Sequence, residues 1–273
     1  MDYILNFEVL DKTSLPTVGG KNASLGEMIK SGVRVPPGFA VTTESYLRFI
    51  TEAGINDKIM RILSKVRPDD VSSLDEASEE IQAIIKKTLM NDDVKAAIRQ
   101  GYSELCRKCR MEDVPVAVRS SATAEDLPNA SFAGQQDTYL WVVGEDHIIN
   151  SIRKCWASLY TARAIDYRNK NDFPHEKVLI SVGVQKMVNS KAAGVMFTLN
   201  PTNGDPSKVV IEGSWGLGET VVSGSVNPDK FVVDKVTREI GERTISLKHI
   251  KCVHDAECGE VTDVDVEEDM QNR

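Results

Sequence analysis

Gly19-Gly20-Lys21 is the first group of residues along the chain whose types suit phosphate chemistry. Two glycines let the backbone approach a ligand closely, and a lysine at a helix start adds positive charge to the free N–H groups there. The segment is not a Walker A loop, because that pattern needs glycine where Leu15 stands and serine or threonine where Asn22 stands. Spacing alone leaves two interpretations open: a phosphate-binding turn, or a glycine turn before an exposed lysine.

A more informative group lies in the segment VAVRSSATAEDLPNASFAGQQDT, residues 116–138. Arg119 follows a buried-type strand, 114–118, and a guanidinium binds phosphate oxygens bidentately. Small hydroxyl residues and a glycine come next, and such a loop can direct N–H groups and hydroxyls at an anion. They are Ser120, Ser121, Thr123, Ser131, Gly134 and Thr138. The alternative is a polar hairpin in which Arg119 pairs with Glu125 or Asp126, and the residues alone do not decide.

Two further candidates lie later in the chain. Gln185 follows the strand expected at 178–184, and a side-chain amide at the join between two lobes can pair with a base or a ribose. On spacing alone it is equally a polar residue at a strand end. The glycine-rich segment 213–224 is either a second phosphate-facing loop or a set of turns that pack under Trp215.

The elements that must position these residues form an α+β pattern. The first lobe, expected over 1–186, mixes strands and helices and contains a helical insert over about 43–110. A β-rich second lobe is expected over 187–273. Strands are predicted at 3–10, 39–41, 114–118, 138–143, 178–188, 194–199, 208–211, 230–236 and 244–252, with helices at 23–30 and 146–169. The acidic last residues, from Gly259 on, are expected to be frayed.

Net charge, cysteine spacing and hydropathy argue against several classes of protein. A net charge of −8 argues against a nucleic-acid binder but leaves room for a local phosphate site. The five cysteines, including Cys106 and Cys109, show no zinc-ligand spacing and are interpreted as reduced thiols. The N-terminus does not resemble a signal peptide and no apolar run is long enough for a membrane span, so we expect a cytoplasmic protein.

Seven segments together resemble a known family. They are VGGKNASLGEM, RVPPGF, VAVRSSATAEDLPNASFAGQQDTYL, CWASLYTARAIDYR, GVQKMV, GVMFT and GSWGLGETVVSGSVNPDKF. In the same order, they resemble the N-terminal nucleotide-binding region of phosphoenolpyruvate synthase, which pyruvate phosphate dikinase and rifampin phosphotransferase share. The similarity runs from Tyr3 to Val236, and RSSATAED and FAGQ are its most specific parts.

This resemblance implies a two-lobed ATP-grasp fold that binds ATP with Mg²⁺. It implies that Lys21 and Arg119 contact the ATP phosphates and that Gly134 and Thr138 line them. It places Gln185 in the nucleotide pocket. Arg119 is the residue to which it gives a catalytic role; the Mg²⁺ ligands are unknown.

The resemblance also implies partners. Family members continue into a Q-x-R-P-like segment, a phosphohistidine domain and a pyruvate-binding barrel, and none of these motifs occurs in the chain. The second lobe is therefore expected to be incomplete, and the chain to be a fragment or a phenylphosphate synthase-like subunit.

Two functions follow from these expectations. In the first, the chain binds ATP for a phosphotransferase that passes the β-phosphoryl group to a histidine on another domain or chain. AMP is released, and the final acceptor is pyruvate or another small molecule; alone, the chain would be inactive. In the second, the chain is a non-catalytic module that binds a nucleotide or a partner.

Overall fold

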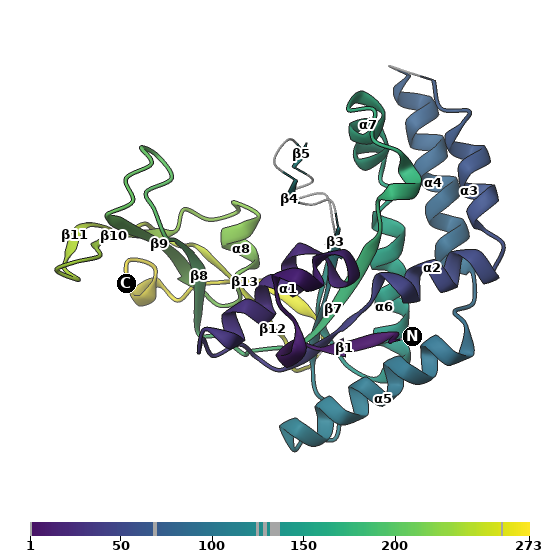
Figure 1. The fold of residues 1–273 in the computed structure, drawn as a ribbon. Coiled ribbons are helices and arrows are strands. Elements are labelled where there is room, and N and C mark those ends of the chain that lie inside the picture. Colours follow the sequence, from purple (N-terminus) through teal and green to yellow (C-terminus); the bar gives the residue numbers. More distant parts are fainter. Residues whose placement is uncertain (1, 68–69, 124–125, 128–129, 132–136, 258) are drawn as a thin grey trace. The chain divides into compact units, whose positions relative to one another are not determined.

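The chain divides into two compact units, Met1–Met187 and Val188–Arg273 (Figure 1). The computed structural model describes residues 2–67, 70–123, 126–127, 130–131, 137–257 and 259–273. Helices and strands both contribute, which confirms the α+β class. None of the helices in these ranges is both long and apolar enough to cross a membrane.

Unit 1 is built on a five-stranded sheet in which every neighbouring pair of strands is antiparallel. The strand order is β1-β2-β7-β3-β6. Their bounds are Ile4–Asn6 (β1), Gly38–Val41 (β2), Val116–Ala122 (β3), Thr138–Val142 (β6) and Ile180–Lys186 (β7). A separate short pair joins β4, Asp126–Leu127, to β5, Ala130–Ser131. The central strands β3 and β7 come from distant parts of the chain, so the sheet ties the unit together.

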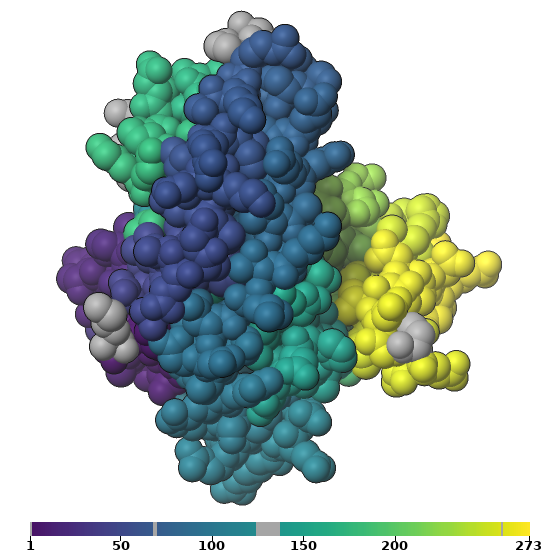
Figure 2. All heavy atoms as spheres, turned by 90° about the vertical axis from the view of Figure 1, so that its right-hand side faces the viewer, coloured from purple at the N-terminus to yellow at the C-terminus, as the bar shows by residue number. Residues whose placement is uncertain are grey.

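Helices cover both faces of this sheet (Figure 1). One face packs on α1, Leu15–Lys30, and the other packs on α6, Glu145–Ser158. The remaining helices are α2 (Thr43–Glu52), α3 (Asn56–Leu63), α4 (Val71–Lys87), α5 (Asp92–Cys109) and α7 (Ala162–Lys170), with 3₁₀ turns η1 (Phe7–Val9), η2 (Lys12–Ser14) and η3 (His175–Lys177). Figure 2 shows the blue helical segment spread over one outer face of unit 1. Helices α2 to α5 lie between Thr43 and Cys109, the region in which the sequence predicts a helical insert.

The main core lies on the α6 face of the sheet. Val116 and Val118 of β3 and Val182 and Val184 of β7 point into it and pack with the fully buried Trp156 of α6. Strand residues alternate between faces, so the residues between these valines must point the other way, toward α1. That second face carries the polar side chains of β3 and β7.

A break in α1 brings its backbone against β3. Gly19 has φ 71° and ψ 169°, outside helical values, between helical residues on both sides. A Cβ built on Gly19 would lie 2.2 Å from the Ser121 carbonyl oxygen, so only glycine fits here. The predicted glycine turn at 17–21 is therefore a kink inside a longer helix.

Asn22 anchors the second half of α1 to the sheet. Its side chain is 2% exposed, and its Nδ2 donates to the Val18 carbonyl at 3.0 Å and to the Ser181 hydroxyl at 3.1 Å. Its backbone N–H donates to the Ser121 hydroxyl at 3.3 Å. Gly183 makes room, because a Cβ there would meet Asn22 Oδ1 at 2.4 Å. Buried donors and acceptors are thus paired between α1, β3 and β7.

Unit 2 contains a four-stranded antiparallel sheet in the order β11-β10-β9-β8 and a two-stranded pair, β12-β13. The strands are β8 (Ala192–Phe197), β9 (Lys208–Trp215), β10 (Asp229–Asp234), β11 (Ile240–Thr244), β12 (Ile250–His254) and β13 (Val261–Asp265), with α8 (Glu219–Val222) and the 3₁₀ turn η4 (Glu268–Met270).

Two predictions for unit 2 are wrong. The strand predicted over 244–252 is interrupted, because the Asp229 carboxylate accepts from Ser246 N–H at 2.9 Å and from the buried Lys248 ammonium at 2.6 Å. These bonds hold the connection between β11 and β12 in a bend. The segment expected to be frayed instead forms β13, which pairs with β12 along its whole length.

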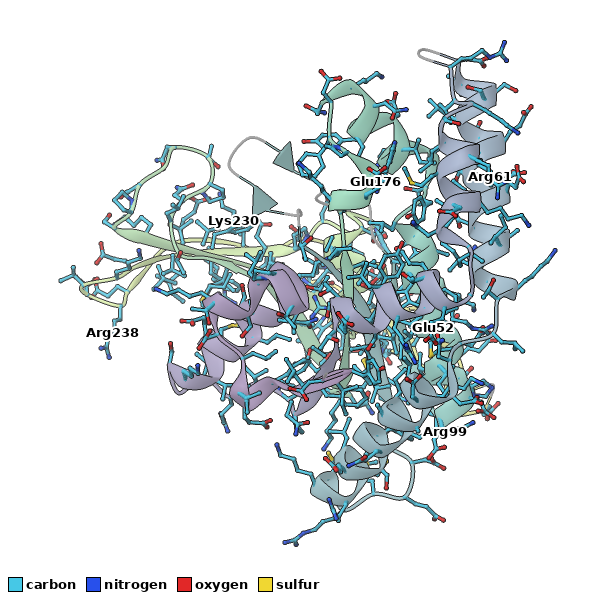
Figure 3. The ribbon with its side chains drawn as sticks, turned by 45° about the vertical axis from the view of Figure 1, so that its right-hand side comes forward. Glu52, Arg61, Arg99, Glu176, Lys230 and Arg238 are labelled. Carbon is cyan, nitrogen blue, oxygen red and sulfur yellow. The ribbon has the colours of Figure 1, made fainter. Side chains whose placement is uncertain are left out.

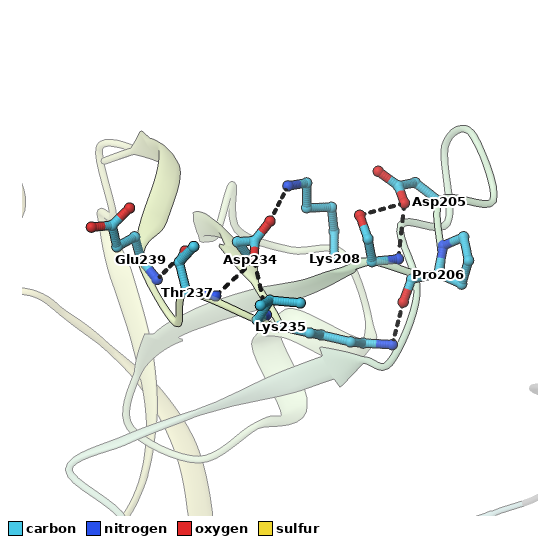
Figure 4. A network of polar contacts seen from close by, with 9 residues as sticks. Asp205, Pro206, Lys208, Asp234, Lys235, Thr237 and Glu239 are labelled. Atoms are coloured by element: carbon cyan, nitrogen blue, oxygen red, sulfur yellow. Dashed lines mark hydrogen bonds and ion pairs between the residues drawn. The ribbon is translucent and has the colours of Figure 1, made fainter.

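Asp234 organises the turn between β10 and β11 (Figure 4). Its carboxylate accepts from Lys208 Nζ at 2.6 Å and from the backbone N–H groups of Val236 at 2.8 Å and Thr237 at 3.0 Å. These donors, with Lys208 foremost, hold the pKa of Asp234 well below its usual range. The turn therefore depends on the charged form of this side chain.

Asp234→Asn should lower the thermal stability of the chain at neutral pH, because the amide loses the charged contact. A lowered carboxyl pKa contributes stability that is present above the usual value, about 4, and lost as pH falls through the lowered value. The difference in melting temperature should therefore shrink below about pH 4. Glu239→Gln, whose side chain lies outside the network, is the control. A difference that persists in acid would contradict this account.

Asn22→Ala should lower the free energy of unfolding by about 1–3 kcal/mol, the usual cost of leaving buried polar groups without partners. The Val18 carbonyl and the Ser181 hydroxyl lose their donor inside the protein. Urea denaturation measures the change, and Ser24→Ala, at an exposed position of the same helix, is the matched control. Equal stability of the two variants would show that the Asn22 contacts do not anchor α1.

Candidate functional site

Strand register gathers the candidate residues of unit 1 on one face of the sheet. Arg119 lies directly opposite Thr138 of β6 on one side and Gly183 of β7 on the other. Gln185 lies opposite Ala117, two residues along the same strands. Opposite residues of antiparallel strands share a face, and so do residues two apart. Arg119, Thr138 and Gln185 therefore share the face that α1 covers.

Arg119 lies in the middle of β3 rather than after its end. The sequence predicted that the strand stops at Val118, but the ladder to β7 continues through Ser120 and Ser121 to Ala122. Both serines are buried, and their small side chains fit between the sheet and its covering helices. Arg119 is half-buried, and its position is fixed by pairing on both sides.

Lys21 reaches the same place from α1. Its ammonium donates to the Ser120 carbonyl at 3.2 Å, beside Arg119 in the chain. The kink at Gly19 and the Asn22 anchor determine where this turn of α1 lies. The Lys21 ammonium thus lies against the backbone of β3 one residue after Arg119, and two cations placed close together would suit a polyanion.

Of the remaining candidates, the structure describes Thr138 but not Gly134. Thr138 begins β6 and is exposed, so its hydroxyl is available to a ligand. Gly134 lies outside the described residues, as do the side chains of Glu125 and Asp126, which the hairpin alternative pairs with Arg119. Among the described side chains, no carboxylate forms an ion pair with Arg119.

Gln185 is held by the turn that precedes β2. Its side chain is 8% exposed, and Nε2 donates to the Pro36 carbonyl at 3.2 Å. The proline pair after Val35 makes this turn rigid, so the amide has a defined orientation. The structure therefore places Gln185 at the edge of the polar face rather than beside Arg119.

The positive charge of Lys21 affects the pKa of Cys155, a residue of α6. Burial raises the pKa of the Cys155 thiol, Asp137 raises it further, and the Lys21 ammonium opposes the shift. Cys155 Sγ lies 3.8 Å from both the Val118 and the Asp137 carbonyl oxygens. The thiol is thus neutral and inert under the site, in agreement with a reduced structural cysteine.

In the glycine-rich segment of unit 2, the structure supports the packing interpretation at one position. Gly216 has φ 80°, and a Cβ built on it would lie 2.2 Å from the Cys252 carbonyl oxygen. The Trp215 indole N–H donates to the Met270 carbonyl at 3.0 Å. Gly216 therefore allows β9 to pass close to β12.

Mg²⁺ has no dedicated cluster of ligands in the part of the chain that the structure describes. No three His, Cys, Asp or Glu side chains gather there in a way that could hold a metal ion. The described residues of the polar face offer hydroxyl, amide and cationic groups, which suit phosphate oxygens rather than a hard cation.

Sequence reasoning missed two residues of this site. Asn22 was noted only as a departure from the Walker A pattern, and Gly183 was not singled out. Neither has a recognisable motif, because their roles depend on the packing of α1 across β3 and β7. The one available signal was the position of Asn22, directly after Lys21.

Comparison with known proteins agrees with this geometry. The pyruvate phosphate dikinase, AMP/ATP-binding domain family matches residues 15–273. The chain is 51% identical over 271 residues to a probable phosphoenolpyruvate synthase of Staphylothermus marinus, with 98% of this chain and 32% of that protein covered. It is 47% identical over 273 residues to a probable phosphoenolpyruvate synthase of Methanocaldococcus jannaschii, with 100% and 23% covered.

A third relative is the phosphoenolpyruvate synthase of Pyrococcus furiosus, 44% identical over 292 residues, with 95% of this chain and 36% of that protein covered. The chain thus spans about a third or less of the length of these relatives. The match covers nearly all of the chain and includes Lys21, Arg119, Thr138 and Gln185. The chain belongs to the pyruvate phosphate dikinase AMP/ATP-binding domain family.

Proposed function

We propose that unit 1 binds the phosphates of ATP with Lys21 and Arg119. The observation that carries this proposal is the contact of the Lys21 ammonium with the Ser120 carbonyl, which brings it beside Arg119 on one face of the sheet. A phosphate chain between them would neutralise both cations, and Arg119 can bind its oxygens bidentately. Membership in an AMP/ATP-binding family supports the choice of ligand.

The neighbouring residues have narrower roles in this proposal. Thr138, opposite Arg119 and exposed, offers a hydroxyl to the phosphates, and Gly134 lines them with its backbone. Gln185 faces the nucleotide from the far end of the same face, with its amide oriented by Pro36. Mg²⁺ would bind with the phosphates of ATP and neutralise part of their negative charge.

We further propose that the chain is the nucleotide-binding part of a dikinase-type phosphotransferase with an ATP-grasp fold. A histidine on another domain or chain attacks the β-phosphorus of ATP, and the bond from that phosphorus to the α-phosphate oxygen breaks, so AMP leaves. The γ-phosphoryl group is then hydrolysed to inorganic phosphate, and pyruvate or another small acceptor receives the β-phosphoryl group from the histidine. Arg119 would stabilise negative charge that develops on the moving phosphoryl group. The names of the relatives support this reaction class.

Arg119→Ala should weaken ATP binding by roughly 10–100-fold, the range expected when a charged hydrogen-bonding partner is removed. Arg119→Lys should recover only part of the affinity, because an ammonium cannot reproduce the planar two-donor contact. Calorimetry with ATP and a non-hydrolysable analogue measures both. Arg61→Ala is the matched control, since the side-chain bond of Arg61, labelled in Figure 3, is to the Asp57 carbonyl of its own helix among the described residues. Equal affinities of Arg119→Ala and the unaltered chain would contradict the proposed role.

β-labelled ATP separates phosphotransfer from simple binding. The chain alone should acquire no stable label, and AMP and labelled histidine should form when a histidine-bearing domain is supplied. A non-catalytic module would bind nucleotide in the first experiment and give neither product in the second.

A further inference from the structure

A hollow lined by charged and apolar side chains lies in unit 1, and neither Lys21 nor Arg119 lines it. Its volume is about 600 Å³, and it is bordered by the end of α3, the start of α4, the C-terminal half of α7 and residues 172–175. Figure 2 shows α7, in green, beside the blue helices. The hollow is lined by two unusual side chains, Arg168 and His175.

Arg168 is a buried cation without a polar partner. Its side chain is 0% exposed, and none of its three nitrogens forms a hydrogen bond with a described residue. Other arginines with a buried nitrogen have polar partners. Arg153 donates to the Lys86 and Thr88 carbonyls at 3.1 Å, and Arg48 pairs with carboxylates.

The described groups that favour the Arg168 charge are two tyrosines, Tyr160 and Tyr46. The guanidinium carbon lies 5.3 Å from the Tyr160 ring centroid, a cation–π contact. Such contacts compensate only part of the cost of removing a charge from water. Burial accordingly lowers the pKa of Arg168. A guanidinium keeps its proton in proteins. An anionic partner would therefore offset the remaining free-energy cost of burying this charge.

His175, which also lines this hollow, has a second buried nitrogen without a described partner. Its Nε2 lies 3.0 Å from Asn169 Oδ1, whereas its buried Nδ1 has no partner among the described residues. Burial and the Arg168 charge lower the pKa of His175 to about 4, against the opposing effect of Glu176 (Figure 3). When protonated, His175 could donate from Nε2 to Asn169 and from Nδ1 to an anion.

We propose that Arg168 and His175 form a binding site for a small oxyanion, a phosphate or a carboxylate, distinct from the nucleotide phosphates. The anion accepts hydrogen bonds from the guanidinium and from the His175 imidazolium. Because Arg168 is 0% exposed, a side chain or segment that borders the hollow must shift for the anion to reach the guanidinium.

Binding at this site must be linked to pH. The anion favours the charged imidazole, so it raises the pKa of His175, and its own affinity increases as pH falls toward that pKa. The other charged groups around the hollow carry both signs. They are Arg67, Asp166, Lys170, Asp172 and the neighbouring Glu176. Three of them are engaged already, Arg67 with Asp70 and Lys170 with Asp166.

The test uses inorganic phosphate and acetate as probes on the unaltered chain and on Arg168→Met. Methionine fills the space without the charge, and removing an unpaired buried cation often stabilises a protein. Arg168→Met should therefore melt no lower than the unaltered chain in anion-free buffer, and phosphate or acetate should raise the melting temperature of the unaltered chain but not that of Arg168→Met. Arg163→Met removes an exposed arginine from the same helix and is the control.

A second readout follows His175 directly by NMR titration of the imidazoles, with His175→Gln to assign its signals. The probe should raise the His175 pKa in the unaltered chain and in Arg163→Met, and affinity should drop roughly 10–100-fold in Arg168→Met. Phosphate acting without acetate would identify a phosphate site, and both acting would identify a general oxyanion site. A His175 pKa that neither probe changes, or equal stabilisation of Arg168→Met, would overturn the proposal.

Discussion

The close approach of α1 to the sheet at Gly19 is the constraint on which the candidate site depends. A Cβ at this position would overlap the Ser121 carbonyl oxygen, and the positive φ breaks the helix where it meets β3. The next turn of α1 is then bound by Asn22 to Ser181 and Ser121. Lys21 lies between these two constraints, so its ammonium is delivered to the Ser120 carbonyl by packing rather than by a flexible loop.

Unit 1 uses the two faces of its sheet for different purposes. Val118, Val182 and Val184 fill the main core on the α6 face, and burial of such side chains stabilises the fold. On the α1 face, the same strands carry hydroxyl, amide and guanidinium groups in register. A rigid apolar face behind a polar one gives the site a support that does not move when a ligand binds.

Arg119 and Arg168 show how context separates two arginines of one domain. Arg119 is half-buried on a strand, opposite the exposed Thr138, where an incoming phosphate can be reached without rearrangement. Arg168 is enclosed against Tyr160 with no polar partner among the described residues. Arg119 is therefore accessible to a ligand from solvent, whereas Arg168 is not accessible in this conformation.

Much of this architecture was predictable from the sequence because it depends on local patterns. Apolar spacing predicted helices over about 43–110. The motif around Arg119 indicated the AMP/ATP-binding family to which the chain belongs. The position of Arg119 within β3 was not predictable, because small polar residues such as Ser121 carry no strand signal unless their packing partner is known. The bend at Lys248 and the strand at Val261–Asp265 depend on the contacts of Asp229 and β12, which come from elsewhere in the chain.

The most direct test of the central claim is labelling with an acyl phosphate of ATP, which transfers its acyl group to a lysine beside the bound phosphates. Mass spectrometry then identifies the modified lysine. The account predicts that Lys21 is labelled, that excess ATP protects it, and that Arg119→Ala reduces the labelling while Arg61→Ala does not. Labelling that ATP does not prevent, or protected labelling of another lysine with Lys21 unmodified, would contradict it.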